Sequence, residues 1–430
     1  MKLLVLGGGH CQLNAILKAK DQGHSLIISD YYEDAPGKAF CDYKELVSTF
    51  DVDGNIEIGK KHSIDGVITL GTDQPVYTAA KVQEALALPF LIDSKTAKAV
   101  TNKKIMKTIF KDNFIPTARF TFIKRDFGYK DIADLKFPVV IKPLDSQGQR
   151  GVYKLNSIKE VRNSIDKTLS YSREDEILIE EYYENDEITI SGWVEENKVY
   201  VLTVTDRVTY NNYPLIGICT AHNFPSKHLF SNYDEIIDIT RQLVKSFNIH
   251  NGPIYFQMLV GKEGIKVNEI ACRVGGAYED IFIPYLTGID ILDMLIKSSL
   301  GVTSDLSISN IKKYNILNNH KKLSVQLLFA KPGKIKDIEL CGEEIFGDSP
   351  EINPLFTLTN PLPGVKKIQL NIKKDDEIGE ILNATQRIGF MIVEGSSNAE
   401  LKKNLDFAFD NFKIVDSLGN NLLINFHNYL

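Results

Sequence analysis

Hydrophobic and polar positions along the first 93 residues follow a repeated order of strand, loop and helix. Short apolar runs at 2–6, 25–29 and 66–70 have the length and the flanking residues of buried strands. Segments 11–22 and 74–88 carry apolar residues at helical spacing. Such repeated units predict a parallel sheet that helices cover on both faces.

The middle stretch, residues 94–303, mixes helices with longer strands. Asn102 has the position of an N-cap for a helix over 103–112, which ends before Ile115-Pro116. The pattern predicts strands at 137–143, 152–155, 176–183, 187–194 and 198–208, a helix at 232–247, and a hairpin of 252–260 with 264–276. This order predicts an α+β region with an antiparallel meander.

The last stretch begins with a polar segment, 304–322, that we interpret as a linker. It is followed by predicted strands at 323–330 and 387–395 and by a helix at 399–409. We therefore expect three domains, 1–93, 94–303 and 304–430, of classes α/β, α+β and α+β. The last domain could be a packing domain without site residues.

Composition limits the possible partners. The chain has 430 residues, of which 43% are hydrophobic and 25% charged, and a formal net charge of −6. No basic field exists to hold a nucleic acid, and no apolar run is long enough to span a bilayer. The five cysteines are scattered without CxxC spacing, and the start of the chain has no export pattern. We expect a soluble, cytoplasmic protein without nucleic-acid or membrane partners.

The hairpin carries the most informative chemistry. If its turn centres on Glu263, Gln257 lies opposite Glu269, and period-two alternation places Arg273 on the same face and Asn268 on the other. An amide oxygen beside a carboxylate suits Mg2+, which takes few protein ligands and completes its shell with phosphates and water. Arg273 could then bind a phosphate or carboxylate held by that metal. A surface hairpin with ordinary polar residues is the alternative.

Two further segments could bind phosphates. Lys103 lies just inside a helix start, where its ammonium can donate to phosphate oxygens. The loop 144–151, rich in glycine and small polar residues, can fold over a polyphosphate, although it lacks the Gly-Lys-Ser/Thr of a Walker A loop. The same loop could also be an ordinary strand connection.

The N-terminal loop offers a different hypothesis. Gly7-Gly-Gly9 ends the first predicted strand, and Asp30 ends the second, where a dinucleotide-binding fold has its ribose-binding acid. However, Gln12 occupies the third glycine position of that fingerprint. A nicotinamide-dependent oxidoreductase therefore remains an alternative function.

These motifs in this order resemble the ATP-grasp ligases. The matching elements are the Leu-Gly-Gly-Gly start, Ile-Lys142-Pro with its glycine-rich loop, Ile-Glu180-Glu-Tyr-Tyr with Glu187, and Gln257 with Glu269 and Arg273-Val-Gly-Gly. The chain is similar to carbamoyl-phosphate synthetase large-chain-like proteins, biotin carboxylases, purine-pathway glycinamide ligases and L-amino-acid ligases. The resemblance runs from residue 1 to about residue 300, and the segment around Arg387 resembles the C-terminal domain of L-amino-acid ligases.

The resemblance implies a role for each matched residue. Lys103 and Lys142 would bind the ATP phosphates, Glu180 would lie on the adenine side, and Glu187 would bind the ribose. Glu269 and Gln257 would hold Mg2+ or Mn2+, and Arg273 would contact the transferred phosphate. The remaining matched residues are Ser146, Gln147, Gly148 and Gly151 in a mobile loop over the phosphates and Glu181, Tyr182 and Tyr183 in an adenine clamp. His222 lies in a segment that resembles the active-site loop, although a surface histidine is an equal alternative.

This sequence departs from the family pattern at two positions. The family usually has Glu-x-Asn-x-Arg where this chain has Glu269-Ile-Ala271-Cys-Arg273, and Gln257 replaces a frequent glutamate. The number of metal ions and activity itself are therefore open. We expect an ATP-dependent ligase that joins a small carboxylate to an amine through an acyl phosphate, and the resemblance makes a homodimer one of the expected states. A purine-type or bicarbonate- or formate-activating ligase and a degenerate ATP-binding protein are the alternatives.

Overall fold

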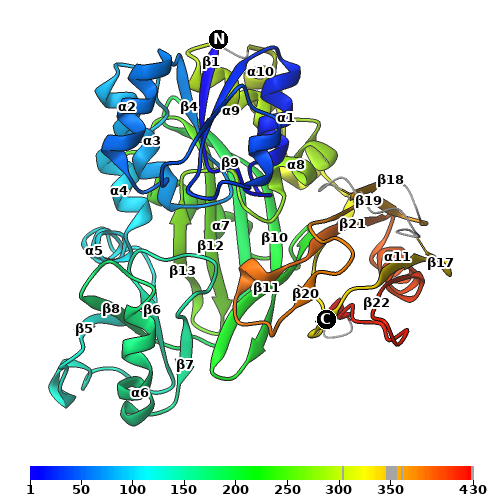
Figure 1. The fold of residues 1–430 in the computed structure, drawn as a ribbon. Helices are drawn as coiled ribbons and strands as arrows, with labels where there is room; N and C mark the ends of the chain where they lie inside the picture. Colours follow the sequence, from blue (N-terminus) through cyan, green and yellow to red (C-terminus); the bar gives the residue numbers. More distant parts are fainter. Residues whose placement is uncertain (303–304, 345–355, 360–361, 428–430) are drawn as a thin grey trace. The chain divides into compact units, whose positions relative to one another are not determined.

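The computed structural model describes residues 1–302, 305–344, 356–359 and 362–427. The chain forms two compact units (Figure 1). The first comprises 1–147, 155–204 and 228–319, and the second comprises 148–154, 205–227 and 320–430. The predicted three-domain division stays a prediction.

The first unit begins with a four-stranded parallel sheet, drawn in blue in Figure 1. Its order is β3-β2-β1-β4, and all three strand pairs are parallel. The strands are β1 (Lys2–Leu6), β2 (Ser25–Ser29), β3 (Tyr43–Glu45) and β4 (Gly66–Ile68), and the helices are α1 (Leu13–Asp21), η1 (Pro36–Ala39), α2 (Val52–His62) and α3 (Gln74–Ala85). Leu4, Leu6 and Ile27 pack with Ile58 and Val82 from these helices, which confirms the α/β prediction.

The rest of the first unit contains two antiparallel arrays, β5-β8-β6 and β13-β12-β9. Their strands are β5 (Phe120–Lys124), β6 (Val139–Pro143), β8 (Glu176–Glu181), β9 (Asp186–Glu195), β12 (Gly252–Gly261) and β13 (Gly264–Ala271). The helices are α4 (Ser94–Thr101), α5 (Lys103–Asp112), η2 (Tyr129–Asp131), α6 (Ile158–Leu169), α7 (Tyr233–Ser246), α8 (Glu279–Thr287), α9 (Ile291–Ser299), α10 (Asp305–Lys313) and η3 (Ile316–Asn318). The structure contains the predicted strands β6, β8 and β9, the predicted helices α5 and α7 and the predicted hairpin in the expected order, whereas β5, α6, α8 and α9 were not predicted.

Two strands are divided between the two units, because the chain passes from one unit to the other within each strand. These are β7 (Tyr153–Leu155) and β10 (Lys198–Asn212). The segment 304–322, interpreted above as a linker, instead contains α10 and η3. That expectation was wrong because polar composition does not exclude a helix, and Ile311 and Ile316 are buried.

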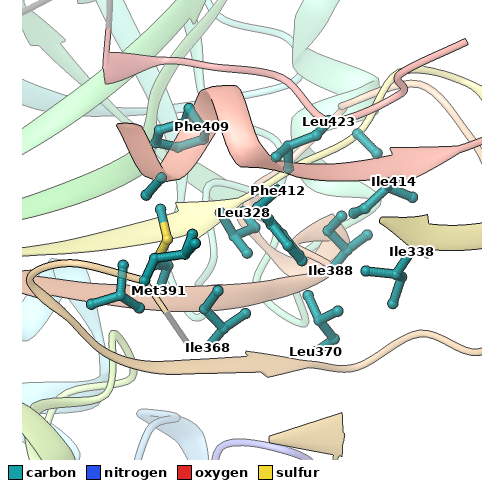
Figure 2. Close-up of a cluster of buried hydrophobic side chains, with 14 of the residues drawn as sticks. Leu328, Ile338, Ile368, Leu370, Ile388, Met391, Phe409, Phe412, Ile414 and Leu423 are labelled. Carbon is teal, nitrogen blue, oxygen red and sulfur yellow. The ribbon is translucent and has the colours of Figure 1, made fainter. Parts of the chain in front are cut away.

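The second unit is built on an antiparallel array with the order β10-β11-β14-β21-β19-β18. Its elements are β11 (Leu215–Phe224), β14 (Lys322–Leu328), β15 (Gly333–Lys334), β16 (Asp337–Leu340), β17 (Glu343–Glu344), β18 (Phe356–Thr359), β19 (Val365–Leu370), β20 (Glu377–Ile378), η4 (Ala384–Gln386), β21 (Gly389–Gly395), α11 (Asn398–Asn411) and β22 (Phe412–Val415). Figure 2 shows its core, where Met391 on β21 and Phe409 on α11 pack with Phe412 and Ile368. This arrangement confirms an α+β C-terminal region.

Among the described residues, no helix combines the length and the apolar character needed to cross a membrane.

Candidate functional site

Strands β12 and β13 form the predicted hairpin, and Gln257 lies directly opposite Glu269. This pairing confirms the register expected from the sequence. The turn is tighter than expected, because Gly261 pairs with Gly264 and leaves residues 262–263 between them. From this turn, regular pairing would place Gln257 opposite Asn268. Gln257 lies opposite Glu269 because the strand register shifts by one residue between Met258 and Gln257.

That shift is a β-bulge, and Asn268 is its extra residue on β13. Asn268 Oδ1 accepts a hydrogen bond from Lys142 Nζ at 2.8 Å, and Asn268 Nδ2 lies 3.4 Å from Gln257 Oε1. The Asn268 side chain therefore lies on the same face of the hairpin as the Gln257 side chain. The expectation that Asn268 faces away was wrong, since period-two alternation does not hold across a bulge.

Glu269 forms an ion pair with Lys103. Helix α5 begins at Lys103, and the Asn102 side chain caps it, as predicted. Lys103 Nζ lies 3.0 Å from Glu269 Oε1 and donates to the Ser146 carbonyl at 2.8 Å. Burial by itself would raise the pKa of Glu269, but the charges of Lys103, Lys142 and Arg273 lower it below its usual value. Glu269 is therefore anionic at neutral pH, as a metal ligand must be.

Glu180 is buried between two lysine ammonium groups. Lys142 Nζ contacts Glu180 Oε1, and Lys107 Nζ lies 2.8 Å from Oε2. Val140 on β6 lies opposite Glu180 on β8, so Lys142 is a diagonal neighbour on the same face. Burial alone would raise the pKa of Glu180, but Lys107 and Lys142 outweigh it and lower the pKa to about 2. The carboxylate therefore fixes Lys142, whereas its adenine-side role stays a prediction.

Lys107 is a residue that the sequence reasoning missed. It lies one helical turn after Lys103 on α5, so the two side chains share a helix face. Its ammonium also donates to Thr117 Oγ1 at 2.6 Å, and burial lowers its pKa. The four-residue spacing on a predicted helix was a signal that could have identified it.

Arg273 is held by Asp73, a second residue that the sequence reasoning missed. Arg273 Nε donates to Asp73 Oδ1 at 2.6 Å, and the guanidinium carbon lies 4.9 Å from the centre of the Tyr255 ring. Burial opposes the charged guanidinium, yet the Asp73 carboxylate raises the pKa of Arg273. Asp73 follows β4, and polar residues after a parallel strand are candidates for a site. That position was the available signal.

The predicted adenine clamp lies beside the hairpin turn. Tyr183 Oη donates to the Gly264 carbonyl at 2.8 Å and accepts from the Glu263 N–H at 3.0 Å. The N–H groups of Glu181 and Tyr182 already donate to the carbonyls of residues 119 and 138. Of the three predicted clamp residues, Tyr183 is therefore the one that we expect to offer its amide to a base.

Glu187 lies on β9 opposite Leu259 of β12. Gln257 lies two residues from Leu259 on the same strand, so Glu187 and Gln257 occupy one face as diagonal neighbours. Glu187 is half-buried there. The structure thus places the predicted ribose-binding acid on the same sheet face as the predicted metal ligands.

The predicted phosphate loop is divided between the two units after Gln147. In the first unit, the Gln147 side-chain oxygen accepts from the Asp73 N–H, and the Ser146 side chain is buried. In the second unit, Gly148 and Gly151 have φ values of +69° and +72°. Side chains are strained in that left-handed region, so glycine suits both positions.

The pair of Gln257 and Glu269 fits a Mg2+ ion. Within the part of the chain that the structure describes, no three His, Cys, Asp or Glu side chains are grouped to hold a metal. Mg2+ does not need such a group, because one or two protein oxygens and substrate phosphates suffice. A carboxylate that stays ionised and an amide oxygen directly across from it provide those oxygens.

The N-terminal glycine loop does not favour the nicotinamide hypothesis. Asp30 Oδ2 accepts from the Gly8 N–H at 2.8 Å, and Asp30 Oδ1 accepts from the Tyr32 N–H at 2.9 Å. Both carboxylate oxygens of Asp30 therefore accept hydrogen bonds from backbone N–H groups of the protein. A ribose-binding acid would instead turn its oxygens toward sugar hydroxyls.

His222 lies in the second unit and is buried, so the alternative of a surface histidine was wrong. Its Nδ1 lies 2.9 Å from Thr205 Oγ1, and Arg207 is directly opposite on β10. Burial, with the charges of Arg207 and Arg387, lowers the pKa of His222 to about 3. The imidazole is therefore neutral at physiological pH.

Comparison with known proteins agrees with this architecture. Residues 135–279 match the family model of the ATP-grasp domain, and residues 359–416 match that of the L-amino acid ligase C-terminal domain 2. The fold is therefore that of the ATP-grasp proteins. Residues 135–279 are thus similar to an ATP-grasp domain, and residues 359–416 are similar to the C-terminal domain of L-amino acid ligases.

Individual relatives are distant. The formate-dependent phosphoribosylglycinamide formyltransferase of Sulfurisphaera tokodaii is 24% identical over 212 residues, which cover 47% of this chain and 53% of that protein. The chain thus spans about half the length of this curated relative. The L-amino acid ligase of Bacillus licheniformis has a TM-score of 0.78 at 17% identity, covering 97% of this chain and 98% of that one.

A second similar structure was solved with a nucleotide. The biotin carboxylase domain of the Hydrogenobacter thermophilus 2-oxoglutarate carboxylase, in complex with MgADP, ADP and bicarbonate, has a TM-score of 0.72 at 15% identity. The match covers 96% of this chain and 90% of that one. At such identities the likeness shows the fold.

Proposed function

We propose that this protein is a Mg2+- and ATP-dependent ligase that joins the carboxylate of one small molecule to the amine of another. The observation that carries this proposal is one cluster in the first unit, where Lys103, Lys142 and Arg273 surround the oxygen pair of Gln257 and Glu269. Lysines, an arginine and metal-ligating oxygens are the groups that phosphoryl transfer requires.

The nucleotide would bind over the face shared by Glu187, Gln257 and Glu269. Lys103 and Lys142 would donate to its phosphates, the Tyr183 amide to its base, and Glu187 would accept from its ribose. Ser146 and Gln147, the loop residues that belong to the first unit, would lie beside the phosphates. ADP bound to a similar fold supports ATP as the nucleotide.

The reaction has two steps. A substrate carboxylate oxygen attacks the γ-phosphorus of ATP, the bond to the β-phosphate oxygen breaks, and ADP leaves. The amine nitrogen then attacks the acyl carbon, phosphate leaves, and the nitrogen gives up a proton. Arg273 would neutralise the transferred phosphoryl group, and Mg2+, or Mn2+ in its place, would supply positive charge between the phosphates. Exclusion of water protects the acyl phosphate.

A purine-type or formate- or bicarbonate-activating ligase is the second candidate. The named activity of the formyltransferase relative and the bicarbonate in the carboxylase complex favour it. Both candidates use the same nucleotide chemistry and differ in the carboxylate. A catalytically degenerate ATP-binding protein would bind MgATP without turnover.

The test is a phosphate-release screen with MgATP over pairs of amino acids, with formate and bicarbonate as further carboxylates. We expect release with at least one pair and its loss on removal of Mg2+ with EDTA. Glu269→Ala and Arg273→Ala should lose release, whereas Glu263→Ala, at the exposed turn of the same hairpin, should retain it.

Two results would count against parts of the proposal. Full activity of Glu269→Ala would refute its assignment as a metal ligand. Tight MgATP binding without release from any pair would favour the degenerate protein.

A further inference from the structure

Asn268 links two residues of the nucleotide site that lie on different strands. Its Oδ1 accepts from Lys142 Nζ at 2.8 Å, and its Nδ2 lies 3.4 Å from Gln257 Oε1. Asn268 reaches both because the bulge in β13 turns it onto the face of Gln257. The side chain is half-buried, so these contacts are partly shielded from water.

The chemistry of the three groups fixes the direction of these bonds. An ammonium group donates and cannot accept, so Lys142 must face the oxygen of the Asn268 amide. The NH2 group of Asn268 then points to Gln257, and a donor there must meet the Gln257 oxygen. The lysine charge therefore determines which way both amides are turned.

We propose that Asn268 is a positioning residue, which orients the Lys142 ammonium for the nucleotide phosphates and the Gln257 amide oxygen for the metal. This inference rests on the proposed function of the same site. An amide oxygen has two lone pairs, so Gln257 Oε1 can accept from Asn268 and still ligate a cation. A flipped Gln257 would present an NH2 group, which repels a cation.

The proposal also gives a physical meaning to Ala271. Ala271 is buried opposite Tyr255 and has no side-chain oxygen that could take part in the site. Asn268, which precedes Glu269 in the sequence whereas Ala271 follows it, instead places an amide group in the site. It acts through Lys142 and Gln257, because these are the residues that its amide oxygen and its NH2 group contact.

Lys142 would keep one fixed partner without Asn268. Its contact with Glu180 would remain, but a single contact leaves the ammonium free to swing about that carboxylate. The loss should therefore appear in binding of the nucleotide and of the metal more than in folding.

The test uses Asn268→Leu, which has a similar volume and removes both hydrogen bonds. ADP affinity is measured by calorimetry with and without Mg2+, and Mn2+ affinity of the protein–ADP complex by electron paramagnetic resonance. We expect both the MgADP and the Mn2+ affinities to fall about tenfold, with the melting temperature nearly unchanged. Asn163→Leu, exposed on α6, is the matched control and should change neither affinity.

A double-mutant cycle separates positioning from general damage. If Asn268 acts through Lys142, adding Asn268→Leu to Lys142→Met should weaken metal-free ADP binding little further. Fully additive losses, or wild-type Mn2+ and ADP affinities in Asn268→Leu, would overturn the inference. If Asn268→Leu does not fold, Asn268→Ser, which is small and polar, carries the same expectation.

These outcomes are distinct from failure of the proposed function. Wild-type protein that binds no MgADP would contradict both. Wild-type binding with an unaffected Asn268→Leu would overturn the role of Asn268 alone, and it would do so even if no ligation substrate is found.

Discussion

Arg273 Nε donates a hydrogen bond to Asp73 Oδ1 at 2.6 Å, which joins the loop after β4 to the end of β13. The two side chains are only 9% and 15% exposed. A second bond, from the Gly71 N–H to the Val274 carbonyl at 3.0 Å, joins the same segments. Asp73 therefore fixes the guanidinium in the absence of substrate, and such preorganisation suits the phosphate-binding role that we propose for Arg273.

Asp73→Asn should destabilise the protein by about 2 kcal/mol, because it leaves a buried guanidinium without its counter-charge. Urea unfolding at neutral pH measures this loss. In a cycle with Arg273→Met, the double variant should lose less stability than the two single variants together. Asp238→Asn removes the partner of Arg241 in an exposed pair and should change stability by less than about 0.5 kcal/mol. Equal losses for Asp73→Asn and Asp238→Asn would contradict this account.

Glu180→Gln should change how stability depends on acid pH. In the folded protein Lys107 and Lys142 overcome the effect of burial and lower the pKa of Glu180 from 4.5 to about 2, so its ionised form favours folding. That contribution is complete above pH 4.5 and is lost as the pH falls toward 2; at roughly 1.4 kcal/mol per pKa unit it amounts to about 3 kcal/mol. Urea unfolding at pH 6, 4 and 3 should therefore show a smaller fall for Glu180→Gln than for the wild type.

The control for this prediction is Asp175→Asn. Asp175 pairs with Lys124 at 2.7 Å, but both side chains are exposed. Solvent screens this pair, so the variant should follow the wild type closely over the same pH range. A wild-type profile that is flat between pH 4.5 and 3 would show that the two lysines do not hold Glu180 ionised.

Phe412→Ala should destabilise the second unit by about 3–5 kcal/mol, since the Phe412 ring is fully buried in the cluster of Figure 2. Phe407→Ala, in α11, is the matched control because its ring is 43% exposed. Thermal unfolding should show a large fall in melting temperature for the first variant and a small one for the second. Similar falls in the two melting temperatures would mean that burial does not determine how much these two rings contribute to stability.

Periodicity was sufficient to predict β1, β2 and β4 of the parallel sheet, β6, β8, β9 and β10 in the middle stretch, and the Asn102 cap, but it did not predict β3, β5 or β11. These features depend on neighbours in sequence, where apolar spacing and capping chemistry act directly. It also predicted the Gln257–Glu269 pair, although through a wider turn than the structure has. The tight turn changes the strand pairing by one residue, and the bulge changes it back. No local sequence pattern reveals either feature.

The partners of the site residues could not be predicted in the same way. Asp73 and Arg273 are far apart in sequence, and nothing local indicates that they pair. Asn268 was assigned to the wrong face because a bulge depends on the partner strand. Burial of His222 depends on the strands beside β11, which its own segment does not specify. Tertiary contacts decide each of these cases.

Glu279 should make the protein less stable as the pH rises from 4.5 to about 7. Its carboxyl is fully buried beneath the Gly275–Gly276 turn, and its Oε2 accepts from the Ala277 N–H at 2.8 Å. A Cβ at Gly275 would lie 2.2 Å from the Glu279 carboxyl carbon, so a larger residue there would displace the carboxyl group from its present position. Burial outweighs this bond and the charge of Arg273 and raises the pKa of Glu279 from 4.5 to about 7.

A carboxyl group whose pKa is raised by folding binds its proton more tightly in the folded state, so stability falls as the pH rises from 4.5 to about 7. At roughly 1.4 kcal/mol per pKa unit, the loss is about 3 kcal/mol and stays constant at higher pH. Glu279→Gln keeps an acceptor for the Ala277 N–H but cannot ionise. Urea unfolding should therefore find it more stable than the wild type at pH 8 and nearly equal at pH 5, whereas Glu263→Gln, at the exposed hairpin turn, should show no such difference. The same stability difference at both pH values would mean that Glu279 does not take up a proton on folding, and its burial would then need another explanation.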